Sequence, residues 1–408
     1  MPGGKGLTAP FDITEIYGAD VLYESEGIIL ESERNTAKLF GAAHTCYSCG
    51  GSTLAVQAML AAVREDGGRK IAAGRYSHRS LISSAVLLGL DIDWIYPDSF
   101  LSCRITSELA ESVIDKDTSA LFVNAVDYYG GRSDIKALSR VCKSHGIPLL
   151  ADNAHGAYLV FTENHPVRNG ADMCADSAHK TLPALTGTAY LHLSDDRYYS
   201  SVKASMALFG SSSPSYLLLD SLDLCSRFIA ENKAAAIDKL RKISVLKEKL
   251  LESGFSLRDS DPLRITLDAA SVGYSGHELA ASLRENYIEC EMCDADYVVL
   301  LFSVVQPDKD FDIILSVLNR LKKRPPKPRQ TVSVIRPEYV LSPREAYFSA
   351  SETVPIKQSP GRICSGILCP CPPCVPVVMP GERIDSDIAD VLSSFGIDNI
   401  KVCSQYKS

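Results

Sequence analysis

The sequence predicts an α/β protein with a central, mostly parallel β-sheet. Short apolar runs alternate with amphipathic segments of helical length through the first half of the chain. Strands that alternate with helices in this way pair in parallel, because each helix returns the chain to the same end of the sheet. A chain of 408 residues is long enough for about two or three domains.

The predicted strands are short and apolar, as expected for strands buried on both faces of a sheet. The helices that accompany them carry apolar residues at helical spacing. Ligands of such sheets gather at the carboxyl ends of strands. In chain order, the strands are 70–73, 91–96, 120–125, 148–152 and 187–193, and the helices are 54–64, 81–88, about 107–114 and 134–144.

The second half of the chain predicts a smaller α+β domain. A Ser-rich loop at 209–221 leads into a helix, and a long charged helix at 230–251 follows it. One later helix opens with the capping box Ser275–Glu278, in which each side chain caps the other residue's backbone N–H. The remaining elements are strands at 264–267 and 297–303 and a helix at 311–322.

A basic, proline-rich linker at 322–329 precedes the last part of the chain. The segment Ser342-Pro343-Arg344-Glu345 then forms another capping box, with proline at its favoured first helical position. We therefore predict an N-terminal arm at 1–45, a large domain at 46–229, a small α+β domain at 230–324 and a C-terminal α+β domain at 331–408.

Composition excludes several classes of function. The net charge of −8 and the pI near 5.6 argue against nucleic acid as a partner, because phosphate binding needs a basic face. No apolar run approaches the ~20 residues that span a bilayer, and the first residues lack the apolar core of a signal peptide. We therefore expect a cytoplasmic protein whose 13 cysteines are reduced thiols.

Three cysteines near the C-terminus have a spacing that could ligate zinc. Cys369, Cys371 and Cys374 form a Cys-x-Cys-x-x-Cys pattern, with Cys364 nearby. Prolines flank the sulfurs and no histidine lies close in sequence. We therefore interpret this segment as turn-rich and predict no metal site in the chain.

A carboxylate and an amine stand out in the large domain. Asp152 closes the apolar run 147–150, and Lys180 follows 28 residues later among small and hydroxyl-bearing side chains. Pyridoxal phosphate (PLP) needs an amine to hold its aldehyde as a Schiff base and an acid to keep its pyridine nitrogen protonated. Either residue alone is explained as well by a helix cap or a surface charge, but the pair in this context favours PLP.

A phosphate site is expected at the start of the helix at 54–64. The preceding residues are Gly50-Gly51-Ser52-Thr53. Glycines let the backbone approach an anion, while free N–H groups, the helix dipole and hydroxyls stabilise it. Ser and Thr at a helix start are more often plain N-caps.

Together these motifs resemble the ornithine/lysine/arginine decarboxylases, a family of fold-type-I PLP enzymes, in their short bacterial form. Ser-x-His-Lys with Asp-x-Ala-His upstream is the most specific match, and Ser-Pro-Arg-Glu-Ala belongs to the family's own C-terminal domain. The matching segments run through nearly the whole chain: Met1–Gly6, Asp12–Glu15, Gly51–Thr53, His78–Ser80, Asp152–His155, Ser177–Lys180, Ser212–Tyr216, Ser342–Ala346 and Gly361–Ile363.

The resemblance implies a fold-type-I, transferase-like large domain and a homodimer or larger assembly with shared active sites. It also implies PLP-dependent decarboxylation of arginine, lysine or ornithine in polyamine metabolism. Lys180 would carry the cofactor, Asp152 would pair with the pyridine N–H, and His78 would stack on the ring and help return a proton after CO₂ leaves. His155 would flank the ring. The phosphate would be held by Ser52, Thr53, Ser177 and His179, with Ser212 reaching it from a second subunit.

Selection of a basic substrate requires an acidic group at the far end of the pocket. The candidates are Glu352, Asp20 and Glu15. The chain departs from the family pattern at Gly4, where the family has His, and at Val126-Asp127, where it has Pro-Thr. A further departure lies at 370–374. Two alternatives stay open: another fold-type-I reaction such as transamination or side-chain cleavage, and a catalytically weak homologue with a binding or regulatory role.

Overall fold

The large domain is built around a seven-stranded sheet with the strand order β1-β7-β6-β5-β4-β2-β3. The computed structural model describes residues 13–329, 334–369 and 375–405. The five strands from β3 to β6 along this order are parallel, whereas β7 and β1 are antiparallel to their neighbours. The strands are β1 (His44–Ser48), β2 (Lys70–Gly74), β3 (Asp91–Ile95), β4 (Thr118–Asn124), β5 (Leu149–Asp152), β6 (Met173–Asp176) and β7 (Ala189–Leu193).

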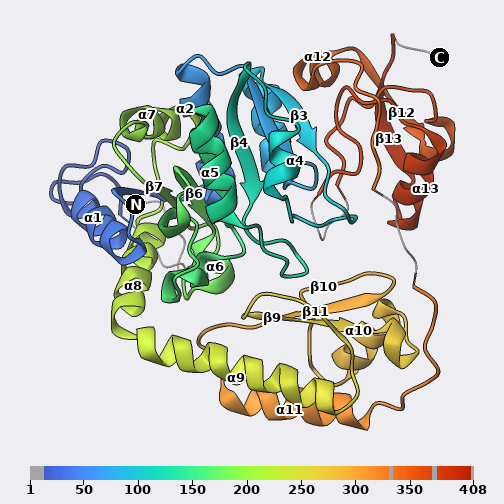
Figure 1. Cartoon of the computed structure of the whole chain (residues 1–408). Coiled ribbons are helices and arrows are strands. Elements are labelled where there is room, and N and C mark those ends of the chain that lie inside the picture. The colour runs from blue at the N-terminus through green and yellow to red at the C-terminus, as the bar shows by residue number, and fades with distance from the viewer. Residues whose placement is uncertain (1–12, 330–333, 370–374, 406–408) are drawn as a thin grey trace, which may run out of the picture.

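Helices cover both faces of this sheet, which confirms the predicted α/β class (Figure 1). Alternate residues of one strand enter different cores: Leu121 and Val123 pack on one face of β4, and Ala120 and Phe122 on the other. The helices of the large domain are α1 (Ile28–Phe40), α2 (Gly51–Glu65), α3 (Arg79–Leu88), α4 (Ser107–Glu111), α5 (Ile135–His145), η1 (Ala157–Phe161), η2 (Val167–Asn169), α6 (Ala178–Thr181), α7 (Tyr199–Phe209) and α8 (Tyr216–Glu231).

The small domain has an antiparallel four-stranded sheet of order β10-β11-β9-β8. Figure 1 shows this sheet facing the large domain, with α9 and α11 on its outer side. The predicted capping box forms at the start of α10, where Ser275 and Glu278 cap each other's backbone. The elements are α9 (Lys233–Glu252), β8 (Leu257–Arg258), β9 (Arg264–Asp268), η3 (Ala270–Val272), α10 (Gly276–Glu285), β10 (Met292–Cys293), β11 (Tyr297–Leu301) and α11 (Asp308–Arg320).

The C-terminal domain has its own core and lies beside β2 and β3 of the large domain. Arg75, at the end of β2, forms a fully buried ion pair of 2.5 Å with Glu382, and Arg344 donates to the carbonyls of Val86 and Leu87. The capping box predicted for Ser342 and Glu345 is present. The elements are α12 (Pro343–Phe348), β12 (Ser351–Pro355), η4 (Ile356–Gln358), α13 (Ser386–Ser394) and β13 (Asn399–Cys403).

Several elements differ from the sequence expectation. Residues 28–40, which the sequence analysis placed in an N-terminal arm without a helix, form helix α1, whose buried stripe includes the polar residues Glu33 and Thr36. Because Glu33 is satisfied by Lys203 and by the N–H of Tyr47, a polar residue occupies a core position and obscures the apolar pattern. Strands β1 and β6 and helix α7 were also not predicted.

The cysteines of the described ranges other than Cys369 are free thiols. Cys371 and Cys374, which belong to the Cys-rich segment considered for zinc, lie outside those ranges, as do Met1–Gly6. Among the residues described, no helix combines the length and the apolar character needed to cross a bilayer.

Candidate active site

Asp152 and Lys180 lie at the carboxyl ends of adjacent parallel strands. Asp152 is the last residue of β5 and is paired in register with Ala175 of β6. Helix α6, which carries Lys180, begins directly after β6. The missed strand β6 therefore provides the connection that brings the predicted amine to the same sheet edge as the predicted carboxylate. Asp152 is buried, and one of its oxygens accepts from the N–H of Ala154 at 3.0 Å.

His155 contacts the lysine directly. Its Nε2 lies 3.1 Å from Nζ of Lys180, and its ring is tilted against that of Tyr128 at a centroid distance of 4.6 Å. Burial, followed by the charge of Lys180, lowers the pKa of His155 well below its ordinary 6.5. A neutral imidazole beside an ammonium accepts a hydrogen bond from it, which orients the amine.

The charges of Asp152 and Lys180 both affect the pKa of His78. It is the N-cap of α3, where Nδ1 accepts from the N–H of Ser80. Burial lowers the pKa of His78, the charge of Lys180 lowers it further, and the carboxylate of Asp152 opposes both. The structure thus brings His78, Asp152, His155 and Lys180 into one electrostatic cluster.

The residues expected to hold phosphate come together in part. Ser177 Oγ donates to Ser52 Oγ at 2.9 Å, which joins the N-terminus of α2 to that of α6. Gly51 has a left-handed φ of 63° at the start of α2, so glycine is required there. His179 donates through Nδ1 to the carbonyl of Thr188 at 2.9 Å, which fixes the ring and leaves Nε2 as its second polar atom.

Thr53 and the Ser-rich loop line one cavity of about 340 Å³. Thr53 is exposed, and Ser211 and Ser213 face the same cavity, whereas Ser212 is exposed beside it. Within one chain, no hydrogen bond is recorded between Ser212 and the other predicted phosphate residues that the structure describes.

The candidate substrate acids are not gathered at this cluster. Asp20 has a structural role: its carboxylate accepts from the N–H groups of Glu26, Gly27 and Ile29, at the start of α1. The negative charge of Asp20 thus stabilises a helix N-terminus, and its contact with substrate stays a prediction.

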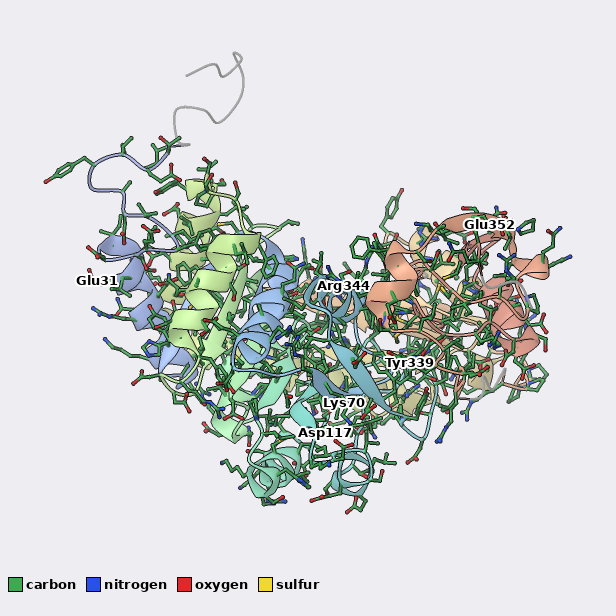
Figure 2. All side chains as sticks on the ribbon, turned by 90° about the horizontal axis from the view of Figure 1, so that it is seen from above. Glu31, Lys70, Asp117, Tyr339, Arg344 and Glu352 are labelled. Carbon is green, nitrogen blue, oxygen red and sulfur yellow. The ribbon has the colours of Figure 1, made fainter. Side chains whose placement is uncertain are left out.

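Glu352 lies on β12 and pairs with Arg362 at 2.7 Å. Figure 2 shows Tyr339 and Arg344 at the junction with the large domain, whereas Glu352 lies farther out on the C-terminal domain. Glu15 is exposed. The pKa of the Tyr216 phenol is raised mainly by burial and, to a smaller extent, by the negative charge of Glu15.

A buried polar group behind Lys180 was not anticipated. Asp176, the last residue of β6, contacts His165, His192 and Asn153. Burial alone would raise the pKa of Asp176, but the two imidazoles lower it below its usual range. A carboxylate directly before the Ser-x-His-Lys segment was visible in the sequence, but nothing in sequence spacing connects it to residues 165 and 192.

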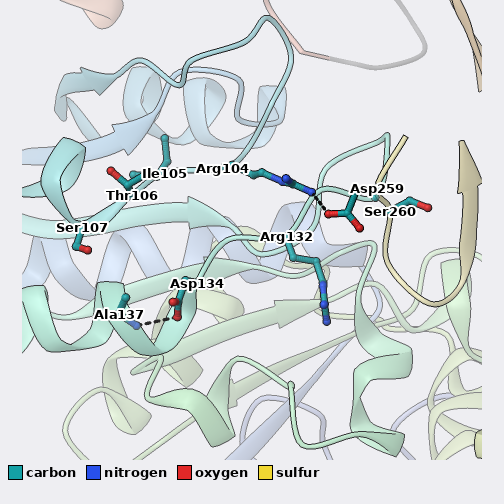
Figure 3. A pocket seen from close by; sticks show the side chains of 10 residues that line it. Arg104, Ile105, Thr106, Ser107, Arg132, Asp134, Ala137, Asp259 and Ser260 are labelled. Atoms are coloured by element: carbon teal, nitrogen blue, oxygen red, sulfur yellow. Dashed lines mark hydrogen bonds and ion pairs between the residues drawn. The ribbon is translucent and has the colours of Figure 1, made fainter. Parts of the chain in front are cut away.

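A cavity of about 370 Å³ lies elsewhere, between the large and small domains (Figure 3). Arg104 and Asp259 pair across it at 2.6 Å, and Asp134 accepts from the N–H of Ala137. The predicted site residues do not line this cavity, and Arg104 and Asp259 on its wall pair with each other. The Lys180 cluster is therefore the candidate site.

The residues at the Lys180 cluster fit PLP by their chemistry. They offer an amine, a buried carboxylate, two imidazole rings and a pair of hydroxyls at helix N-termini. The Nδ1 atom of His155 is buried and makes no hydrogen bond to the described part of the chain. An orphaned polar atom beside the amine is consistent with a pocket shaped for a further polar group.

Two family models match the chain. The Orn/Lys/Arg decarboxylase major domain matches residues 7–260, and the Orn/Lys/Arg decarboxylase C-terminal domain matches residues 328–397. The arginine decarboxylase of Halalkalibacterium halodurans is 30% identical over 409 residues, covering 93% of this chain and 83% of the relative. The arginine decarboxylase of Bacillus subtilis is 29% identical over 410 residues, covering 92% and 83%.

A solved structure of a lysine decarboxylase from Francisella novicida shares the fold. Its TM-score is 0.77 at 16% sequence identity, covering 94% of this chain and 73% of that one. At this identity the likeness concerns the fold alone, and it supports the three-domain, fold-type-I architecture.

Proposed function

The chain belongs to the Orn/Lys/Arg decarboxylase family, and from this premise we propose that it removes CO₂ from a basic amino acid with PLP as cofactor. The substrate is arginine, lysine or ornithine, and the product is the corresponding amine, which enters polyamine metabolism. The observation that carries the proposal is the cluster at the sheet edge, where Lys180 lies 3.1 Å from His155 and shares its electrostatic environment with Asp152 and His78.

Lys180 is the residue proposed to hold the cofactor, and Asp152 the anion that keeps its ring nitrogen protonated. When bound, PLP supplies an electron sink for the carbanion left by CO₂. Asp152 can serve because it is buried at a strand end, where few waters screen its charge. His155 orients the amine, and its depressed pKa keeps a second positive charge away from Lys180.

His78 is proposed as the ring-stacking residue that returns a proton to carbon. Its Nδ1 is held by Ser80, so its orientation is fixed and Nε2 remains for proton transfer. The carboxylate of Asp152 raises the pKa of His78 against the effect of burial. This balance favours an imidazole that both accepts and releases a proton.

Ser52, Thr53, Ser177 and His179 are proposed to bind the phosphate. Ser52 and Thr53 occupy the first turn of α2, where backbone N–H groups have no partner within the helix. Ser212 is proposed to complete this site from a second subunit, because it is exposed next to the cavity that Thr53 lines.

A homodimer would cover an apolar surface formed by α1, α7, α8 and their loops. Tyr216 donates to the carbonyl of Asp20 at 2.6 Å and Ser221 accepts from the N–H of Leu185 at 2.8 Å, so these segments are neighbours. Exposed apolar side chains on neighbouring segments are typical of subunit interfaces. The exposed side chains are Ile16, Val21, Ile28, Leu185, Leu208 and Leu224.

Glu15 is the candidate acid that we propose to test first for substrate selection. It lies on the same surface as the Ser-rich loop, near Tyr216, and its exposed carboxylate is available to a partner's pocket. Glu352 is proposed second, since Arg362 already neutralises it. A reducing, cytoplasmic location is proposed from the 13 cysteines of the sequence, which have no repeating disulfide-type spacing.

The experiment that tests the function measures CO₂ release from arginine, lysine and ornithine by PLP-loaded protein. Release from one or more of the three, with an equal amount of amine, is the expected result. Keto acid formed without CO₂ would instead support transamination. PLP binding with no turnover of any of the three would support the catalytically weak homologue.

A further inference from the structure

A second cluster of ligand-type side chains lies behind the Lys180 segment. It consists of His165, Asp176 and His192, and all three side chains are fully buried. Asp176 ends β6, His192 lies on the neighbouring strand β7, and His165 comes from the segment between η1 and η2. The carboxylate and the two imidazoles therefore come from three separate parts of the sequence and lie close together in the fold.

The spacing of the donor atoms matches a metal site. Asp176 Oδ2 lies 2.9 Å from Nε2 of His165 and 3.4 Å from Nε2 of His192, and the three ligand atoms lie within 4.8 Å of one another. Donors at about 2.0–2.2 Å from a tetrahedral zinc ion are roughly 3.3–3.5 Å apart. The 3.4 Å separation from His192 corresponds to such an edge. The 2.9 Å separation from His165 is that of a hydrogen bond and would lengthen by about 0.5 Å when both groups bind an ion.

The hydrogen bonds within the cluster leave ring nitrogens unsatisfied. Nε2 of His192 lies 3.4 Å from the carboxylate but makes no hydrogen bond to any residue that the structure describes. The residue is 0% exposed, so water does not reach it from the surface. A buried imidazole nitrogen that lies close to a carboxylate and has no hydrogen bond needs an explanation, and a cation bound by both groups provides one.

Neighbouring side chains hold His192 and Asp176 in place, as residues around a metal site hold its ligands. Nδ1 of His192 bonds to Oγ1 of Thr45 at 2.8 Å, which orients Nε2 toward Asp176. Asn153 donates to Oδ1 of Asp176 at 2.7 Å and leaves Oδ2 to face the imidazoles. The ring of Phe40 stacks on His192 at a centroid distance of 4.1 Å. Metal-binding histidines are usually held in this way through their other ring nitrogen.

We propose that His165, Asp176 and His192 bind one divalent transition-metal ion of the zinc type. Two imidazoles and one carboxylate suit zinc better than magnesium or calcium, which prefer oxygen ligands alone. The ion has a structural role: it ties β6, β7 and the segment at 162–166 together directly before Ser177–Lys180. It thereby anchors the start of α6, at a site for which sequence spacing had predicted no metal.

The test begins with the metal content of the full chain expressed with added Zn²⁺. Because the cluster is fully buried, the ion enters during folding, and gel filtration in EDTA should leave it bound. We expect about one zinc per chain in the unaltered protein and in the control His145→Ala, an exposed histidine that pairs with Glu111. In His165→Ala and His192→Ala the content should fall at least about tenfold.

A substitution beside the ligands separates a metal site from a hydrogen-bonded core. Thr45→Val keeps the shape of the side chain but removes the oxygen that orients His192. We expect it to weaken zinc binding by about 10–100-fold, measured by release to a competing chelator during refolding. Affinity unchanged from that of the unaltered protein would overturn the assignment of His192 as a ligand.

X-ray absorption at the zinc edge decides the matter if the alanine variants do not fold. Two imidazole nitrogens and one carboxylate oxygen at about 2.0–2.2 Å would support the proposal. Sulfur ligands would overturn it, because they would place the ion at cysteines such as Cys369. A zinc content below about a tenth of an equivalent per chain in the unaltered protein would also overturn the proposal. The same zinc content in the unaltered protein and in all variants would overturn it too.

Discussion

Nζ of Lys180 lies 3.1 Å from Nε2 of His155, across the end of two parallel strands. The imidazole is buried and faces a cation, so the same contact that orients the amine disfavours protonation of His155. This coupling makes the site sensitive to acid and gives the first prediction.

We expect His155 to destabilise the fold in acid. Its folded pKa lies well below the ordinary 6.5, so below that pH the unfolded chain binds a proton that the folded chain excludes. The free energy of unfolding should therefore fall as pH decreases below 6.5, by up to about 1.4 kcal/mol per pH unit from this residue. In His155→Gln that contribution should be absent.

Urea unfolding at several pH values below neutrality checks the His155 prediction. His145→Gln is the control, because His145 is half-exposed and pairs with Glu111 on the surface. If His155→Gln and the unaltered protein lost stability at the same rate with falling pH, His155 would not be the buried, proton-excluding group.

Lys180→Ala should abolish covalent attachment of PLP. Borohydride reduction of the unaltered protein should fix the cofactor to the peptide containing Lys180, detected by mass spectrometry, because only an amine forms the reducible bond. The variant should give no adduct and no CO₂ release above background. Lys143→Ala, a change at an exposed lysine of α5, should behave like the unaltered protein; an adduct on another lysine would contradict the assignment.

Asp152→Asn should slow decarboxylation by roughly 10²–10³-fold, the usual effect of losing one preorganised electrostatic contact. The substitution keeps the size of the side chain but removes the charge proposed to face the ring nitrogen. Steady-state rates with the best substrate measure the effect, and Asp117→Asn, on the exposed surface, is the matched control. A rate within a factor of about three of the unaltered one would exclude Asp152 from this role.

The same substitution should lower the pKa of His78 further. Burial and Lys180 lower this pKa, whereas Asp152 raises it, so removal of the carboxylate leaves only the lowering influences. NMR titration of the His78 ring in the unaltered protein and in Asp152→Asn measures the change. A higher pKa in the variant would show that the two groups do not face each other.

Glu382→Ala should destabilise the contact between the large and C-terminal domains. Its partner Arg75 is fully buried, and an uncompensated buried charge costs about 3–5 kcal/mol. Glu338→Ala removes a surface ion pair with Arg383 and should cost about 0–1 kcal/mol. Differential scanning calorimetry compares the two, and equal effects would mean that the buried pair does not fasten the domains.

Sequence patterns were most informative where the position of a residue follows from its place at the end of a strand or the start of a helix. Asp152 ends a predicted strand, and the carboxyl ends of parallel strands gather ligands, so this edge of the sheet was predictable as the site. The position of Lys180 at the same edge depends on β6, which was not predicted. The capping boxes at Ser275 and Ser342 were equally predictable, because they depend on residues three apart.

Patterns were less informative where polar residues occupy buried positions. Helix α1 was missed because Glu33 lies on its buried face, satisfied by Lys203, and β6 because its four residues contain no β-branched side chain. Asp20 was assigned to substrate although its carboxylate caps α1. For Glu33 and Asp20 the deciding partner lies on another element, so spacing along the chain carries no information about it.

The sequence by itself determined the α/β architecture, the family and the two residues most tied to PLP chemistry, because these depend on local periodicity and on motifs of fixed spacing. Only the tertiary structure decided that His155 contacts Lys180, that Asp20 stabilises a helix start, and that His165 and His192 meet at Asp176. Those contacts depend on how neighbouring strands are aligned and on where the loops between them run. The packing of the whole domain determines both the alignment and the path of the loops.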